Sequence, residues 1–583
     1  MAGLFDTFTI AKRGLSVQQA NINTTSHNIS NASTTGYSRQ RAVVETTKPF
    51  GGLSRFDTCG AGQVGTGAEV TTIQRIRDVF KDYQVREQKS KYGKLDQENQ
   101  FLTEVGDILN ETSDTGIQGA LSNFYNGFQT LSLDPTKSSN RTVAIQDAST
   151  LANALNNRYT SLETKKSDAQ SLLQTDVVDI NSTLNQINEL NKQITSVSAI
   201  GMSPNDLMDK RDNLLDDLST KFGITVNREK NESVDVSASE LSSMGKIIDG
   251  TDLTGAKDKR FSCIESATFD STTNDLTVTY SVLGDKTNLK TIKIAGATEA
   301  LTKEVLEKRI LIADKDGTPI DPTSGTAIAS STTPADFDKA LFKVEKGEIG
   351  GIQSVQTQIQ KAMDDLDKFA AGLAYSVNAI ATGSTDFATA NSNLANNDPL
   401  FVTKGAATDD GISAKTITIN DTITSDPNKL NCGKDKTSGD KDGTRALAIA
   451  DMISKKMDLT KIDVTSTSTR KEFFTNTATT GSGLNFDAGK LNLDSSTTGG
   501  KLGDFYKSLV SNLATVTKGV KSEFATASDD LDSFQNDRLS ESGVSLDEET
   551  ANLIQYQHAY QASAKVISTV DELLDVVING LKK

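Results

Sequence analysis

The sequence predicts a multidomain α+β protein whose discontinuous domains are nested inside one another, with coiled-coil helices formed by its two ends. Three observations support this. The chain has 583 residues, too many for one hydrophobic core. Apolar residues recur every seven positions at both ends of the chain. Between the ends, helical periodicity is interrupted twice by stretches with strand-like or irregular patterns.

The last forty residues predict one long helix with a narrow apolar seam. A main row recurs every seven residues, and a second row, which also includes Ser563, follows three positions behind it. The apolar members of the two rows are Leu546, Leu553, Tyr560, Ile567 and Leu574, and Tyr556, Val570 and Val577.

The N-terminal end carries the matching stripe, in Leu4, Phe8, Ala11, Leu15, Ile22 and Ile29. We therefore expect the two ends to pair. The first helix is predicted over residues 3–24, because the Asn- and Ser-rich run that follows competes for backbone hydrogen bonds and Gly36 permits a turn. Arg41–Thr47 alternates like a short strand, and a Gly-rich connector covers residues 50–67.

A helical bundle of coiled-coil character is predicted next. The helical period begins at about Thr72 and continues to Leu109. Further helices are predicted over residues 117–132, 140–163, 170–198 and 205–219, with breaks at Pro135 and Pro204.

Two insertions interrupt the bundle. The first is β-rich and includes strands near residues 276–282 and 290–294. The second is mixed, with a strand at 416–420 and a helix at 444–456, and helices over 352–377 and 502–540 lie between and after the insertions. The predicted domains are a terminal coiled-coil assembly domain (1–48 and 541–583), a helical bundle (49–224, 349–394 and 501–540), a β-rich insertion (225–348) and a mixed α/β insertion (395–500).

Composition excludes several classes of function. The net charge is -16 and no run of Lys or Arg is present, which argues against nucleic acid as a partner. No apolar run approaches the eighteen or more residues of a membrane span. The N-terminus carries Asp6 and no continuous apolar core, so no cleaved signal peptide is expected. Cys59, Cys263 and Cys432 are far apart and lack partners at metal-ligand spacing.

The motifs that could carry chemistry are weak. Residues 60–65 match G-x-G-x-x-G but lack the flanking strand and helix of a dinucleotide site, which favours a flexible linker. The segments Asp314–Thr318 and 440–443 resemble calcium loops only in part, and turns are favoured. The only histidines are His27 and His558, and in the seven-residue register both face away from the seam. No catalytic, metal or cofactor site is therefore predicted, and the protein is not expected to be an enzyme.

Two terminal motifs resemble those of the bacterial flagellar rod, hook and hook-associated proteins. The N-terminal signature is carried by Asn28, Asn31, Gly36, Tyr37 and Arg39, and the C-terminal one includes Gln561 and Ala562. The G-Y-S-R-Q ending, together with the N-D-L-M-D-K-R-D-N-L-L-D-D-L segment, is similar to the hook-associated members. His27, Ser33 and Thr35 depart from residues that are common in the family, which leaves the conformation of the turn open.

The resemblance implies an exported structural protein of the extracellular flagellum that joins hook to filament. It implies self-assembly in a helical layer through the seam residues, and contacts with the hook protein, a second hook-filament junction protein and a flagellar export chaperone. The family's terminal helices tend to be disordered in the free subunit, so we expect folding and assembly to be coupled. Another flagellar axial protein, such as a filament subunit or the second junction protein, is the alternative. A secreted enzyme or adhesin carried in one insertion is a more distant one.

Overall fold

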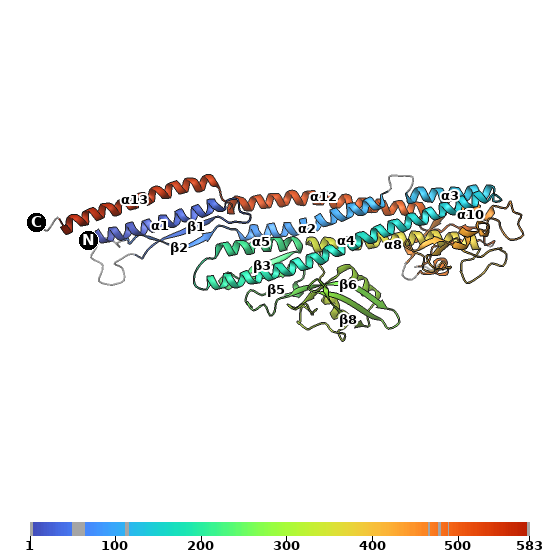
Figure 1. Ribbon diagram of the computed structural model, residues 1–583, viewed down its shortest axis with the longest axis horizontal. Coiled ribbons are helices and arrows are strands. Elements are labelled where there is room, and N and C mark those ends of the chain that lie inside the picture. Colours follow the sequence, from blue (N-terminus) through green and yellow to red (C-terminus); the bar gives the residue numbers. More distant parts are fainter. Residues whose placement is uncertain are drawn as a thin grey trace. The chain divides into compact units, whose positions relative to one another are not determined.

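The computed structural model describes residues 4–48, 65–110, 116–463, 467–475, 480–487 and 489–579. The chain folds into two units (Figure 1). Unit 1 comprises Met1–Lys94, Gln174–Gly350 and Ala525–Lys583, and unit 2 comprises Leu95–Leu173 and Gly351–Phe524. The mixed α+β fold class is confirmed. Among the described residues, no helix combines the length and the apolar character that crossing a membrane requires.

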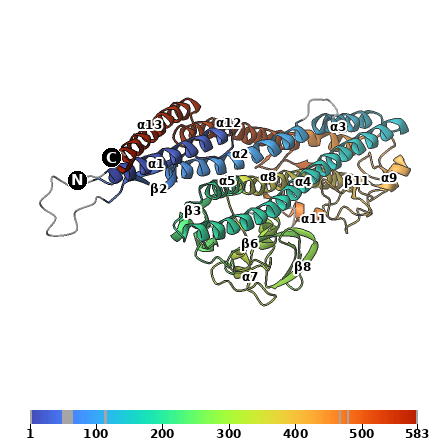
Figure 2. The same ribbon diagram turned by 60° about the vertical axis from the view of Figure 1, so that its left-hand side comes forward.

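The two chain ends pair in unit 1. Helix α1 (Leu4–Asn31) lies beside α13 (Leu546–Asn579) in both ribbon views (Figures 1 and 2). The antiparallel hairpin of β1 (Gln40–Thr46) and β2 (Ala68–Arg75) packs against α1. The pairing expected from the matching seven-residue stripes is present.

Two predicted boundaries in this region are wrong. The first helix does not end at residue 24 but continues to Asn31, because Ser30 and Asn31 bond to carbonyls of the preceding turn, Ser26 and His27, without interrupting the helix. The residues from Thr72 are not helical either. They complete β2, where Val43 pairs with Thr72, and helix α2 (Val79–Leu109) begins only after Arg75.

Besides α1 and α13, unit 1 contains helix α5 (Asn205–Lys221) and parts of three longer helices. These are α2, α4 (Ser138–Ser198) and α12 (Leu502–Ser542). The prediction of separate helices over 140–163 and 170–198 is wrong, because α4 is continuous over 61 residues. Nothing between the two predicted helices breaks it, since that stretch contains no Gly or Pro and buries Leu162 and Ala169.

The β-rich part of unit 1 contains two antiparallel sheets. One comprises β3 (Ile224–Arg228), β4 (Val234–Ala238) and β5 (Lys246–Ile248). The other has the order β8-β7-β6-β9, from β6 (Arg260–Asp270), β7 (Asp275–Val282), β8 (Asp285–Ala295) and β9 (Ile310–Ala313). Its core buries Val278, Ile294 and Phe337, and helices α6 (Glu299–Lys308) and α7 (Pro334–Lys339) adjoin it. The predicted strands at 276–282 and 290–294 are confirmed.

Unit 2 contains α3 (Ile117–Leu133), most of α8 (Gly347–Thr382) and several short elements. Its aromatic core includes Phe124, which lies near Phe128 and Phe401. The short elements are α9 (Asp421–Ser425), α10 (Thr444–Ala450), α11 (Arg470–Phe474) and the strand pairs β10 (Phe401–Thr403) with β11 (Ile417–Ile419), β12 (Lys456–Met457) with β15 (Gly500–Lys501), and β13 (Asn485–Phe486) with β14 (Leu493–Asp494). The predicted helix at 444–456 ends at Ala450, where a 3-10 turn follows.

The weak chemical motifs have structural roles where the structure describes them. Asp314 accepts hydrogen bonds from the backbone N–H groups of Asp316 and Thr318, which closes a turn. Cys263 and Cys432 are buried and unbridged. Cys59 and residues 60–64 of the Gly-rich motif lie outside the described residues.

Candidate assembly site

The predicted seam residues lie on the paired helices α1 and α13, but a single chain covers them only in part. Ala11 and Val570 are buried, as is Val17, which the seven-residue pattern missed. Leu546 and Val577 are exposed. The other seam residues are half-buried, namely Leu4, Phe8, Leu15, Ile22, Ile29, Leu553, Tyr556, Tyr560, Ile567 and Leu574. Close approach of the helices is visible at Gly14, where a β-carbon would lie 3.4 Å from the Ser563 hydroxyl oxygen.

Asn28 is the hub that joins the end of α1 to the start of α13. Its side chain is buried and its amide nitrogen donates to the Gln40 carbonyl (2.9 Å) and to a Glu549 carboxylate oxygen (3.1 Å). Its amide oxygen accepts from the Tyr37 hydroxyl (2.8 Å) and the Gln40 N–H (3.0 Å). Because all four hydrogen bonds of the amide are made, no other residue type can replace it without loss.

The turn after α1 is shaped by the other signature residues. Gly36 has φ +75°, and a β-carbon there would lie 1.8 Å from the side-chain oxygen of Asn213 on α5. Burial, followed by the carboxylates of Asp206, Asp209 and Glu549, raises the pKa of Tyr37 well above its ordinary value. The Tyr37 hydroxyl therefore stays protonated and can donate to Asn28.

Residues 38–40 connect this turn to the elements around it. The Arg39 N–H donates to the Ser542 carbonyl at the end of α12 (2.8 Å), and its guanidinium pairs with Glu548 on α13 (3.1 Å). Gln40 donates to Asp206 on α5 (3.0 Å). Ser38 donates to both carboxylate oxygens of Asp209, from its N–H (2.9 Å) and its hydroxyl (2.8 Å). The G-Y-S-R-Q segment thus ties the terminal helices to the rest of unit 1.

Asp209 belongs to a largely buried ionic network, which we call the anchor cluster. It consists of four arginines and four aspartates, namely Arg75, Arg77, Arg86, Arg538, Asp82, Asp209, Asp212 and Asp216. Arg75 lies 2.7 Å from both Asp209 and Asp212. Arg86 bridges Asp212 (3.3 Å) and Asp216 (2.8 Å), so β2, α2, α5 and α12 are joined at one place.

The cluster neutralises its own charge. Burial alone would raise the pKa of Asp212, but Arg77, Arg75 and Arg86 outweigh it and lower that pKa below its ordinary value. Burial likewise opposes the charge on Arg77, yet Asp212 and Asp82 raise its pKa. The ion pairs thus favour the charged forms of Arg77 and Asp212, and deleting one partner would leave a buried charge uncompensated.

The C-terminal signature residues behave differently. Gln561 and Ala562 on α13 are exposed, as is His558. His27 is not simply solvated, because its Nδ1 lies 2.9 Å from the Tyr37 hydroxyl and its Nε2 lies 3.8 Å from Asp206. In the described part of the chain, no three His, Cys, Asp or Glu side chains are grouped so that they could hold a metal ion.

Sequence reasoning missed the anchor cluster. A signal was present in the spacing of Asp209, Asp212 and Asp216, which places three carboxylates on one face of a helix. On a helix that also buries apolar residues, such a row of carboxylates indicates that basic side chains pack against it. Arg75, Arg77 and Arg86, which lie close together in the sequence, are the basic residues that could have been matched to it.

Comparisons with known proteins match both ends and the helical region. Residues 102–311 match the model of the flagellar hook-associated protein FlgK helical domain. Residues 535–580 match the flagellar basal body rod FlgEFG protein C-terminal model, and residues 8–37 match the flagella basal body rod protein model.

The similarity to two known proteins extends over essentially the whole chain. Flagellar hook-associated protein 1 of Bacillus subtilis is 28% identical over 581 residues, covering 100% of this chain and 99% of the relative. The Escherichia coli protein of the same name is 24% identical and covers 98% of both chains. The solved flagellar hook junction protein FlgK from Burkholderia pseudomallei is 21% identical with a TM-score of 0.37, covering 55% of this chain and 46% of that one. Over its helical region in the family model, and over essentially its whole length in the relatives, this chain is similar to the FlgK-type flagellar hook-associated proteins.

Proposed function

We propose that this protein is a structural component of the bacterial flagellum that joins the hook to the filament. The observation that carries the proposal is the similarity to flagellar hook-associated protein 1 over essentially the full length of both chains. The paired ends support it physically, because they form an elongated element with one side open to further packing. We propose no catalytic role and no cofactor.

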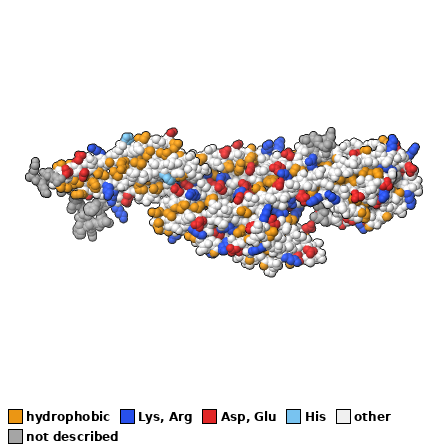
Figure 3. Space-filling view, viewed as in Figure 1, with side chains coloured by type: hydrophobic (Ala, Val, Ile, Leu, Met, Phe, Trp, Pro, Cys, Tyr) orange, Lys and Arg blue, Asp and Glu red, His pale blue; other side chains and the backbone are white. Residues whose placement is uncertain are grey.

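The open side of the helix pair is the proposed contact between copies. Several large apolar side chains of α13 are exposed, among them Ile554, Val566, Leu573, Val576 and Ile578. Hydrophobic side chains gather along this end of unit 1 (Figure 3). Exposed apolar rows of this length mark protein interfaces, and burial recovers about 25 cal/mol per Å². The half-buried seam residues would be covered when copies stack in a helical layer.

The remaining partners follow from this role. A protein between hook and filament must contact the hook protein on one side and a second junction protein on the other. An export chaperone would cover the exposed face of α13 before assembly. We place the assembled protein outside the cell, in the flagellum.

Deletion of the C-terminal helix tests whether the helix pair drives assembly. In a motile strain lacking its own hook-associated protein 1, the full chain should restore attached filaments. A chain lacking residues 541–583 should be exported but leave filaments detached, measured by electron microscopy and by filament protein shed into the medium. Filaments restored by the truncated chain would contradict the proposed role of α13.

A further inference from the structure

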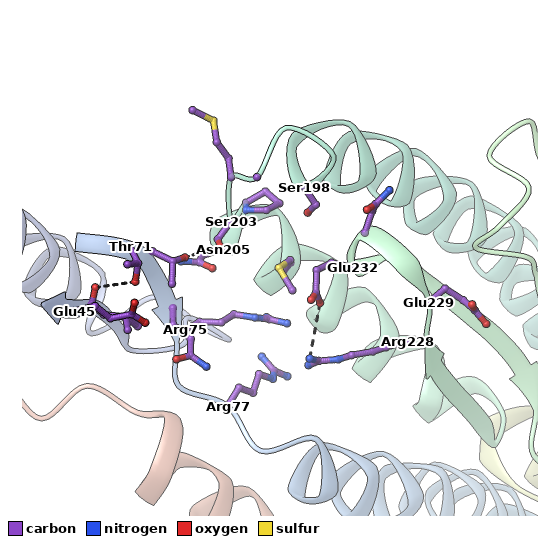
Figure 4. Close-up of a pocket in the computed structure, with 18 residues that line it drawn as sticks. Glu45, Thr71, Arg75, Arg77, Ser198, Ser203, Asn205, Arg228, Glu229 and Glu232 are labelled. Atoms are coloured by element: carbon purple, nitrogen blue, oxygen red, sulfur yellow. Dashed lines mark hydrogen bonds and ion pairs between the residues drawn. The ribbon is translucent and has the colours of Figure 1, made fainter. Parts of the chain in front are cut away.

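A pocket of about 670 Å³ lies in unit 1 beside the anchor cluster. Its walls are the β1–β2 hairpin, the turn between α4 and α5, and the loop from the end of β3 through residues 230–232 (Figure 4). None of the roles assigned above uses this pocket. Its position next to residues that anchor the terminal helices makes its occupant relevant to assembly.

Three guanidinium groups converge in the pocket, those of Arg75, Arg77 and Arg228 (Figure 4). Arg75 is buried, and its Nη1 serves both Asp209 and Asp212 at 2.7 Å. Its Nη2 is also buried and has no hydrogen-bond partner among the residues that the structure describes. An unsatisfied buried N–H of a charged group is costly, and a carboxylate is the acceptor that fits a guanidinium best.

Arg228 is only weakly engaged. Its nearest carboxylate, that of Glu232, lies at 3.9 Å, and both side chains are more than two-fifths exposed. Asn231 and Glu232 hold positive φ values of 57° and 60°, and the Glu232 carbonyl accepts from buried Arg211 (2.6 Å). The loop is thus held in an unfavourable conformation that leaves Arg228 available.

The acidic residues that line the pocket do not occupy its centre. Glu229 extends away from the three guanidinium groups, and Glu45 lies on the far side of β2 from them (Figure 4). Asp209 and Asp212 are already committed to the anchor cluster. The centre of the pocket therefore favours an additional anionic group.

The rim indicates a protein rather than a small anion. Met202, in the turn between α4 and α5, lines the pocket and is 64% exposed, and Ile200 in the same turn is 73% exposed. Val43 of the hairpin and Pro204 also line the pocket and are half-buried. Apolar side chains around a polar centre are typical of protein interfaces. A free phosphate or carboxylate ion would leave this rim uncovered.

We propose that the pocket takes an acidic side chain from a second copy of this chain, with its carboxylate between Arg75 and Arg228. The chain carries 77 acidic against 61 basic residues, so another copy presents a surplus of carboxylates to the exposed Arg228 and to the incompletely bonded guanidinium of Arg75. This inference rests on the proposed function, because it requires copies to lie side by side. It adds a polar contact at a place separate from the apolar face of α13.

Site-specific photo-crosslinking in assembled flagella tests the proposal. A benzophenone amino acid replaces Met202 at the rim, flagella are isolated and irradiated, and the captured peptide is identified by mass spectrometry. The expected product is a peptide of a second copy that contains Asp or Glu. Capture of a different protein, or no capture, would overturn the proposal.

Three variants separate this inference from the proposed function. A benzophenone at Val566 on α13 reports assembly itself, so capture there without capture at Met202 refutes the pocket alone. Arg228→Glu should reduce the Met202 product at least tenfold, whereas Lys210→Glu, the same charge change at an exposed position of α5 outside the pocket, should not. Equal yields from the two variants would also refute the pocket. Absence of both crosslinks, with the protein missing from flagella, would count against the proposed function.

Discussion

Single residues decide how the terminal helices are attached, and Asn28 is the clearest case. Replacing Asn28 by Ala removes four hydrogen bonds and leaves the Gln40 N–H and the Glu549 carboxylate without their partner. We expect a local loss of about 2 kcal/mol, or a roughly thirtyfold easier opening of the segment. Hydrogen exchange of residues 28–40 measures this opening.

The matched control is Asn23→Ala on the same helix, where the side chain is exposed and accepts a hydrogen bond from Gln19 (3.0 Å) on its own helix. That variant should retain the protection of residues 28–40. Equal protection in the Asn28 variant would show that the hydrogen bonds around Asn28 contribute nothing to the attachment.

The sequence identifies some of the residues that attach the terminal helices, but it does not show what they contact. Asn28, Gly36, Tyr37 and Arg39 are identified by resemblance to a family, which gives no contacts. The partner of Asn28, Glu549, is more than five hundred residues away in the sequence, and only the pairing of α1 with α13 brings it close. Glu549 falls seven residues before Tyr556 on the second row of the seam, and its burial agrees with that position. A buried carboxylate needs a polar partner, and the periodicity does not show that this partner is Asn28.

At the scale of elements, long periodic helices could be predicted and their ends could not. Helix α3 matches its predicted span of 117–132 to within one residue, because apolar periodicity persists over several turns. Helix α8 is also present, but it spans Gly347–Thr382 and so extends beyond the predicted 352–377 at both ends. The end of α1 and the start of α2 are set by tertiary contacts instead. Polar residues stay helical up to Asn31, and the Thr- and Ile-containing stretch before Arg75 becomes a strand because β1 offers it a partner.

Helix α8 carries a carboxyl group whose stability contribution depends on pH. Burial, reinforced by Asp364, raises the pKa of Asp367 to about 7, although the Ala414 N–H donates to it at 2.7 Å. A carboxyl group whose pKa is raised in the folded state contributes fully to stability when the pH is below the pKa of the same group in the unfolded chain, near 4. This contribution is lost as the pH rises through 7.

Asp367→Asn removes this titration while keeping an acceptor for Ala414. The variant should be more stable than the parent at pH 8, by up to ~2 kcal/mol, and this advantage should shrink as the pH falls to 5. Thermal unfolding of both proteins at the two pH values measures it. The control Asp365→Asn, whose carboxylate pairs with Lys368 at 3.2 Å, should show no such change between pH values. A pH-independent difference for Asp367→Asn would contradict the assignment.

A charge on the exposed face of α13 should leave the stability of the free chain unchanged but should weaken assembly. Val566 is 43% exposed, so Val566→Asp is expected to leave the circular dichroism and the melting temperature of the free chain unchanged. Filament attachment should nevertheless fall, because a charge would be buried between copies. Ser568→Asp, at a neighbouring exposed polar position, is the control, and motility restored equally by both variants would argue against this face as the contact.

For the molecule as a whole, the proposed assembly role depends on the paired ends, α1 and α13. The sequence predicts the pairing because both ends repeat apolar residues every seven positions. It does not predict the anchor cluster, whose members come from β2, α2, α5 and α12 and meet only in the folded chain. The proposed domain boundaries remain a prediction beside the two observed units.

The central claim is that the protein occupies the junction between hook and filament. Immunogold labelling of intact flagella with an antibody against residues 225–348 tests it most directly, because these residues lie outside α1 and α13, the helices proposed to pack between copies. The account predicts gold in a thin zone where hook and filament meet. Gold distributed along the whole filament, or confined to the hook or the rod, would contradict it.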